Sequence, residues 1–294
     1  MKEKVMYVKL PEGAKYRKVI VTDDGSIGIV YSEECKCQHK MEGITKKVEI
    51  PKPKALVGGC EVYQKDDVPY WYCKIKNGRD EFMHLYMEDL TEEDLLYDSK
   101  TGKERTFSTN NQKKFKKYVL EAINNKPKEG YRWIPVFEPS LTSNGEVQFV
   151  KGKNPLVECS CHNWENMFER YSTENESSKG SKTTYFLLLL RWLKDGFATL
   201  EELADNSRKI GHYWNSNNAK HGLELTGERE FGGLYGFVGN TYKIVGDSNS
   251  RSGFSLLGGG YHQDGNIHPL AFFLYINSPY TKNYFSVGLL ELKK

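Results

Sequence analysis

Two Cys-x-Cys pairs, at positions 35–37 and 159–161, are the residues of this sequence most suggestive of metal chemistry. On a strand, residues two positions apart share a face, so each pair could chelate a soft metal ion. Their spacing differs from that of common zinc modules, and we interpret them as thiols without a metal. His84 and Glu88 stand four apart, but one such pair is not a facial triad, and we assign it to a solvated surface.

Other patterns that could support catalysis are incomplete. Cys60 follows two glycines, but the sequence identifies no paired base that would make it a nucleophile. The glycines at 258–260 are not followed by Gly-Lys-Ser/Thr, which a phosphate-binding loop requires. The sequence therefore favours binding over catalysis.

The stretch from Ser252 to Leu290 is unusual because only Asp264 and Lys282 in it are charged, whereas 28% of the whole chain is charged. It is rich in Tyr, Asn, His and Gln, which are costly to bury without partners. Tyrosine offers large, rigid contact area and small amides offer adaptable hydrogen bonds, as in antibody paratopes. We therefore predict a binding surface. The candidate ligand-binding residues are Tyr261, His262, Asp264, Asn266, His268, Phe273, Tyr275, Asn277, Tyr280, Asn283 and Tyr284.

Within this stretch, residues 270–276 are interpreted as a strand with two different faces, because side chains alternate along a strand. One face would hold Leu270, Phe272, Leu274 and Ile276. We expect the other face, with Phe273, Tyr275 and Asn277, to be the exposed one.

The first part of the chain reads as a small, mainly β domain. Strands are predicted at 5–10, 16–22 and 27–31, and a further pair within 61–75, because these runs are β-rich and separated by turn residues. In residues 111–124 the apolar side chains recur with the spacing of a helix, and an Asn-Asn-Lys-Pro sequence marks the end of that predicted helix. We place a domain boundary there, which gives one domain over 1–125 and a second over 126–294.

The second part contains the clearest helix signals. Residues 183–194 are apolar nearly all round and are closed by Gly196, so this helix should be buried. Thr199 and Glu202 form a capping box that should begin a second helix running to about residue 209. From 227 onward we expect loops and short strands, with core strands at 254–257 and 287–292.

Charge and hydropathy exclude some classes of protein. The formal net charge of +3, from 42 basic and 39 acidic side chains, is too small to indicate nucleic acid as the partner. The longest apolar run, residues 270–276, is far shorter than the ~20 residues of a spanning helix, so no membrane insertion is expected. The first residues lack a signal-peptide core, and we expect the chain to be made and kept in the cytoplasm unless it leaves by lysis or by assembly into a particle.

Four segments, in matching order and spacing, are similar to segments of a known family. Residues 232–245 resemble its G-L-Y-D-M-x-G-N-V-W-E-W-V segment, and residues 256–261 resemble its L-R-G-G-S-W strand. The ending at 284–292 is similar to its closing I-G-F-R-L, and 191–203 stands where the family has a helix and L-P-T-E-A-E-W. The chain from about Glu129 onward thus resembles the formylglycine-generating-enzyme-like group of C-type lectin folds, which includes variable proteins diversified by phage and bacterial retroelements.

The resemblance implies an α+β, C-type lectin-like fold in the C-terminal half, with two helices and a small antiparallel sheet. Its ligand face would be built from the C-terminal strands and loops, and the variable window would run from Tyr261 to Phe285. That window coincides with the charge-poor stretch found from composition alone.

Catalysis by the family's chemistry is not expected. Its oxidase members use a cysteine pair near the C-terminal groove, whereas the last cysteine here is Cys161. A second branch uses non-haem iron held by several histidines, and the first half offers only His39 and His84. Lys243 and Ile244 also replace the usual Glu-Trp. We expect no catalytic residues and no cofactor. The sequence does not decide whether a structural calcium ion is bound, as it is in several members of the similar family.

The resulting hypothesis is a non-enzymatic recognition protein. By resemblance it would be a receptor-binding or tail-associated adhesin of a phage virion, with a protein or carbohydrate on a cell surface as its ligand. Residues 1–125 would attach it to other virion or assembly proteins, and such proteins are frequently homotrimers, which adds avidity. The alternatives are a cytosolic bacterial binding protein of the same fold and a metal- or oxygen-dependent enzyme of the family.

Overall fold

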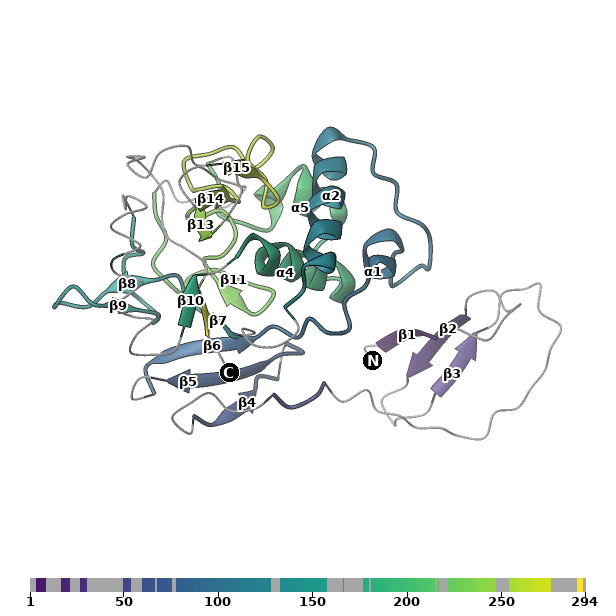
Figure 1. Cartoon of the computed structure of the whole chain (residues 1–294), viewed down its shortest axis with the longest axis horizontal. Helices are drawn as coiled ribbons and strands as arrows, with labels where there is room; N and C mark the ends of the chain where they lie inside the picture. The colour runs from purple at the N-terminus through teal and green to yellow at the C-terminus, as the bar shows by residue number, and fades with distance from the viewer. Residues whose placement is uncertain are drawn as a thin grey trace.

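The computed structural model contains both helices and sheets, so the fold class is α+β, as predicted (Figure 1). It describes residues 4–8, 17–21, 27–30, 50–53, 60–66, 68–75, 78–127, 133–157, 166, 177–179, 181–214, 216, 222–246, 254–275 and 290–292. None of the described helices has the length and apolarity needed to cross a membrane.

The N-terminal strands form a sheet of their own. β1 (Lys4–Val8), β2 (Arg17–Val21) and β3 (Ile27–Val30) pair in antiparallel fashion in the order β1-β2-β3. Val21 lies opposite Ile27 at the start of the second pairing. The three strands predicted from β-rich runs are confirmed, each within a few residues.

A six-stranded antiparallel sheet forms the base of the rest of the described chain. Its order is β10-β16-β7-β6-β5-β4. The strands are β4 (Val62–Gln64), β5 (Trp71–Ile75), β6 (Asp80–His84), β7 (Trp133–Pro135), β10 (Ser177–Lys179) and β16 (Leu290–Leu292). The sheet therefore joins strands from both sides of residue 125, where the sequence predicts a boundary, and the main hydrophobic core does the same.

His84 is buried, and the prediction that it lies on a solvated surface is wrong. It lies on β6, where all five residues are buried, and its ring meets the Trp133 ring at a centroid distance of 5.0 Å. β6 has a strand on each side, β5 and β7, so His84 is inside the molecule and not on a solvated surface.

Helix α2 (Asn110–Asn124) follows the short helix α1 (Glu92–Leu96) and matches the predicted helix within one residue at its start. The Thr109 hydroxyl accepts a hydrogen bond from the Gln112 amide and caps the first turn. Of the stripe that the helical spacing predicts, Phe115 and Val119 are buried and Tyr118 and Ile123 are half-buried; Ala122 is buried as well.

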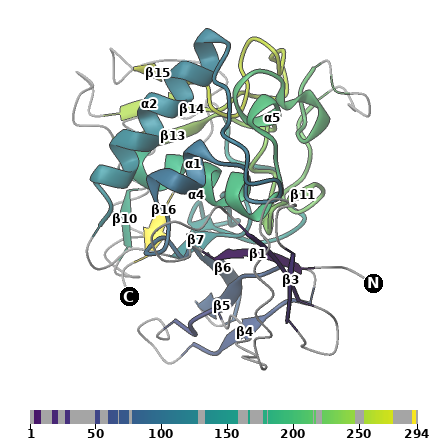
Figure 2. The ribbon, with the colours of Figure 1, turned by 90° about the vertical axis from the view of Figure 1, so that its right-hand side faces the viewer.

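Helix α4 (Lys182–Asp195) lies in the middle of the molecule. Figures 1 and 2 show it between the six-stranded sheet and the layer that holds α2 and strands β13–β15. Every residue from Thr184 to Leu193 is buried, as its apolar circumference predicts. It ends at Gly196, whose φ of 76° is the left-handed conformation that glycine adopts without a steric penalty.

The predicted second helix is present but is divided. The capping box of Thr199 and Glu202 is confirmed at the start of α5 (Leu200–Ala204), and a 3₁₀ turn, η1 (Ser207–Lys209), follows. The break has a local cause: the Ser207 hydroxyl donates to the Glu202 carbonyl at 2.6 Å and closes the end of α5. The same oxygen accepts from the Leu270 amide at 2.7 Å, which ties the break to the C-terminal region.

The other described strands are short, and from residue 227 onward this agrees with the predicted loops and short strands. Two hairpins consist of β8 (Ser140–Leu141) with β9 (Val147–Gln148), and of β11 (Glu230–Phe231) with β12 (Leu234–Tyr235). A three-stranded antiparallel sheet consists of β13 (Lys243–Gly246), β14 (Phe254–Leu257) and β15 (Phe273–Tyr275). All four residues of β14 are buried, which confirms that part of the predicted core.

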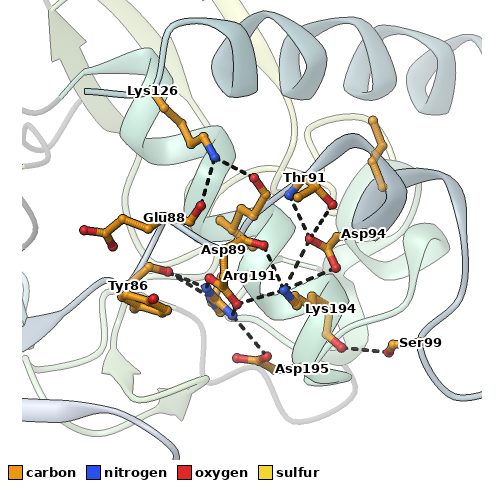
Figure 3. A network of polar contacts seen from close by, with 12 residues as sticks. Tyr86, Glu88, Asp89, Thr91, Asp94, Ser99, Lys126, Arg191, Lys194 and Asp195 are labelled. Carbon is orange, nitrogen blue, oxygen red and sulfur yellow. Dashed lines mark hydrogen bonds and ion pairs between the residues drawn. The ribbon is translucent and has the colours of Figure 1, made fainter. Parts of the chain in front are cut away.

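An ion network ties α4 to α1 and to the segment before it (Figure 3). Arg191 donates to the Tyr86 carbonyl and pairs with Asp89, while Lys194 pairs with Asp89 at 2.8 Å and with Asp94 at 3.3 Å. Burial opposes ionisation of Asp89, but the hydrogen bonds from Arg191 and Lys194 prevail and lower its pKa. Because these partners come from opposite sides of residue 125, the network adds a polar connection to the shared core.

Candidate ligand-binding face

The predicted binding residues divide into three groups. Tyr261, His262, Asp264, Asn266 and His268 lie on the turn that follows β14, and Phe273 and Tyr275 lie on β15. Asn277, Tyr280, Asn283 and Tyr284 lie outside the described residues.

The turn after β14 is held at both sides by backbone hydrogen bonds. The Tyr261 amide donates to the Asn240 carbonyl at 3.1 Å, and the Trp214 amide donates to the Gln263 carbonyl at 3.1 Å. Further along, the Gly265 carbonyl accepts from the Ser207 amide at 3.1 Å. Three separate segments therefore fix the turn in place.

Within the turn, Asp264 organises the backbone. Its carboxylate accepts from the Asn266 amide at 2.7 Å, and its carbonyl accepts from the His268 amide at 2.8 Å. The start of the turn also depends on Gly259, since a Cβ there would lie 2.4 Å from the His268 carbonyl oxygen. Only glycine permits this approach, so the turn has a defined shape before any ligand arrives.

Beneath the turn, Tyr242 of the loop into β13 contacts both histidines. Its hydroxyl is 2.6 Å from His268 Nδ1, and its ring meets the His262 ring at a centroid distance of 6.0 Å. Burial lowers the pKa of both histidines; the neighbouring His268 lowers the pKa of His262 further, whereas Asp264 acts in the opposite direction on His268. Burial also raises the pKa of Tyr242. The arrangement therefore favours a Tyr242 hydroxyl that donates to the unprotonated Nδ1 of a neutral His268.

Two large apolar side chains beside these residues are mostly exposed. Trp214 is 62% exposed and Ile267 is 67% exposed, whereas Tyr261, His262, Asp264 and His268 are half-buried. Sequence analysis did not single out Trp214 or Ile267: the first lies in a loop outside the charge-poor stretch, and the second is an aliphatic residue among polar ones. Hereafter the candidate face is Trp214, Tyr261, His262, Asp264, Asn266 and Ile267.

The predicted strand over 270–276 is wrong in its start and in the facing of Leu274. Leu274 is 51% exposed although the alternation assigned it to the inner side. The late start has a local cause, a turn in which the Phe272 amide donates to the Pro269 carbonyl at 2.8 Å, so that β15 begins only at Phe273. The rings of Phe273 and Tyr275 are 4.7 Å apart and share one face, so Leu274 lies on the opposite face of this edge strand. Tyr275 is 41% exposed, as expected for the outer side.

Phe273 packs toward the helices instead of standing clear of them. Its ring lies 4.9 Å from the Tyr118 ring of α2, and the Lys182 ammonium of α4 is 4.4 Å from its centroid. The same ammonium is 4.3 Å from the Tyr118 centroid and 3.5 Å from the Glu121 carboxylate. This cation–aromatic group anchors β15 to the helical layer, and it leaves Tyr275 as the more accessible aromatic side chain of the strand.

A buried polar cluster lies next to the face and explains an unusual residue. Lys243 is only 5% exposed and its ammonium is 3.1 Å from Glu138 Oε1. Burial lowers the pKa of Lys243, and Glu138 acts against that shift. Asn240 donates to Glu138 Oε2 at 2.6 Å, and its own carbonyl holds the Tyr261 amide. The cluster thus supports the turn from inside.

Within the described part of the chain, no group of three or more His, Cys, Asp or Glu side chains is arranged to hold a metal ion. The Cys-x-Cys pairs at 35–37 and 159–161 lie outside that part. The candidate face combines exposed apolar surface with amide, imidazole and carboxylate groups on a fixed turn, which are the elements of a recognition surface. Comparisons of the chain with protein-family models, curated proteins and solved structures find no match.

Proposed function

We propose that this protein is a non-enzymatic recognition protein that binds its ligand through the candidate face. The observation that carries the proposal is the exposure of Trp214 and Ile267 next to a turn that backbone hydrogen bonds fix in place. Large apolar side chains exposed beside polar ones are a common feature of binding surfaces. A pre-shaped turn adds affinity because less conformational freedom is lost on binding.

The proposal includes a C-type lectin-like fold for the chain from about residue 126 onward. Two features support it: the pair of helices α4 and α5 and the small antiparallel sheet β13-β14-β15 correspond to the elements that the resemblance implies. Apart from Trp214, the candidate face lies on the turn between β14 and β15, inside the window from Tyr261 to Phe285 in which the retroelement-diversified proteins of the similar family vary.

In this proposal the protein is a receptor-binding or tail-associated adhesin of a phage virion, and its ligand is a protein or carbohydrate on a cell surface. Residues 1–125 attach it to other virion proteins, and among them β1–β3 form a sheet of their own. A homotrimer would multiply weak contacts into avidity. The proposal includes no nucleic acid partner and no cofactor.

A binding experiment with matched variants tests the role of the face. The labelled full-length chain is applied to a glycan array and to a panel of intact bacterial cells, together with Trp214→Ala and Leu141→Ala. Leu141 is also exposed, at 40%, but lies on the β8–β9 hairpin. We expect Trp214→Ala to weaken binding by about tenfold or more, as for a central aromatic contact, and Leu141→Ala to bind like the unchanged chain. Equal binding by both variants would contradict the assignment.

The encoding DNA tests the proposed diversification independently. We expect a reverse transcriptase gene nearby and an imperfect repeat of codons 261 to 285. Related chains should then differ at exposed positions such as Tyr261 and Tyr275 and keep Trp192 and Leu200. Differences spread evenly along the chain would argue against a diversified face.

A further inference from the structure

Two cysteines lie together at the edge of the six-stranded sheet. Cys73 is on β5 and is completely buried, and Cys60, two residues before β4, is half-buried. β4 is the edge strand, and its Val62 is paired with Cys73. Cys60 therefore lies where the chain enters the sheet, two residues from Val62, the strand partner of Cys73.

The two cysteines share one apolar environment. Cys60 packs against the apolar cluster to which Cys73 belongs, together with Phe82 and Trp133. Burial raises the pKa of Cys73, and the neighbouring Cys60 raises it further. Cys60 precedes the hydrogen-bonded ladder, so its backbone can move without breaking strand pairing. A disulfide needs a specific separation and orientation, and this freedom on one side allows the pair to reach it.

We propose that Cys60 and Cys73 form a site of reversible oxidative modification, in which peroxide converts the two thiols into an intramolecular disulfide. The inference is independent of the proposed recognition function, because it rests on the sheet edge and not on the candidate face.

The environments of the two sulfurs assign their roles. Cys60 is the more accessible sulfur, so its thiolate attacks hydrogen peroxide: the O–O bond breaks, hydroxide leaves and takes up the thiol proton as water, and Cys60 becomes a sulfenic acid. Cys73 is shielded, and burial raises its pKa, which makes it the poorer nucleophile toward peroxide. Its sulfur then bonds to that of Cys60, and a second water leaves. Two thiols and one peroxide thus give one disulfide and two waters.

The disulfide would restrain the edge of the sheet. It would link the chain entering β4 covalently to β5, where the Trp71 indole already donates to the Ile50 carbonyl at 3.2 Å. We therefore expect the amides of Val62–Gln64 to exchange with deuterium more slowly after oxidation, and to return to the original rate after treatment with dithiothreitol.

Peptide mapping of the full-length chain tests the site. After brief treatment with hydrogen peroxide, remaining thiols are blocked with iodoacetamide and the chain is digested with trypsin. Cleavage after Lys54, Lys65 and Lys74 places Cys60 in peptide 55–65 and Cys73 in peptide 66–74. We expect these two peptides to be recovered as one disulfide-linked species that dithiothreitol separates. Recovery of both as separate blocked peptides, or of Cys60 linked to one of the cysteines at 35, 37, 159 or 161, would overturn the proposal.

Two variants separate the roles of the sulfurs. Cys73→Ala keeps a small apolar side chain in the core, and there the Cys60 sulfenic acid should persist and react with dimedone severalfold more than in the unchanged chain. Cys60→Ser, at the half-exposed position, should leave Cys73 unoxidised and able to react with iodoacetamide only after denaturation. Equal dimedone labelling of Cys60 with and without Cys73 would show that Cys73 does not resolve the sulfenic acid, which also overturns the proposal.

Discussion

At the scale of single residues, the environment of His262 and His268 sets how the molecule responds to acid. Burial lowers the pKa of both imidazoles, so the folded chain binds protons less readily there than the unfolded chain, in which histidine titrates at about 6.5. As the pH falls through that value, the unfolded chain is protonated first. The contribution of these residues to stability is therefore fully present above about pH 6.5 and decreases toward lower pH.

This predicts a specific pH dependence of unfolding. The free energy of unfolding from urea titrations should fall between pH 7.5 and 5.5, and the fall should be smaller in the double variant His262→Gln, His268→Gln, whose amides do not titrate. Both chains contain the same other ionisable groups, so the difference reports the pair beside Tyr242 together with the Asp264 carboxylate that interacts with His268. Parallel curves for the two chains would refute the assignment.

At the scale of elements, a buried ion pair holds β13 to the segment after β7. Lys243 starts β13, and its ammonium contacts the Glu138 carboxylate as well as the carbonyl and hydroxyl oxygens of Thr241. Removing one partner leaves a buried charge without compensation, which costs more than the intact pair contributes.

We therefore predict that Lys243→Met lowers the free energy of unfolding by about 3–5 kcal/mol, as measured by urea denaturation. Lys114→Met, at an exposed position of α2, should change it by less than about 0.5 kcal/mol. Adding Glu138→Gln to Lys243→Met should recover part of the loss, because the unpaired charge is removed. A loss no larger than that of the Lys114 control would show that the pair is not needed for stability.

Some elements were predictable from the sequence and others were not, and the difference is whether their signals are local. Helix α4 and the capping box at Thr199 were predictable because their signals are local: apolar residues around a whole helix, and two residues three apart. The exposure of Leu274 was not, because it depends on which face of the edge strand β15 is covered in the folded chain, and the covered side is the one where Phe273 packs against Tyr118 of α2. Lys243 looked like a lost functional residue, since its partner Glu138 is distant in sequence. Trp214 was missed because its place beside the turn depends on folding.

At the scale of the whole molecule, residues on both sides of position 125 share one sheet and one core. β7 is paired with β6, and Arg191 of α4 takes its partners Tyr86 and Asp89 from the earlier part of the chain. A fragment that starts at residue 126 would lose these partners and expose the apolar side of α4.

We accordingly predict that residues 126–294 alone do not fold, whereas residues 50–294 keep a cooperative transition, because the described strands β1–β3 pair among themselves. Near-ultraviolet circular dichroism and urea unfolding of the two fragments check this. A native near-ultraviolet spectrum for 126–294 would instead support an independent second domain with its boundary near residue 125.

The position of β16 in the strand order has a consequence for biosynthesis. β16 lies between β10 and β7, and it leaves the ribosome after both of them. Until then, the nascent chain carries two unsatisfied backbone edges where the missing strand belongs, and such edges recruit other chains. Polypeptides that stop prematurely would keep those edges open, so we expect them to be captured by chaperones or proteases.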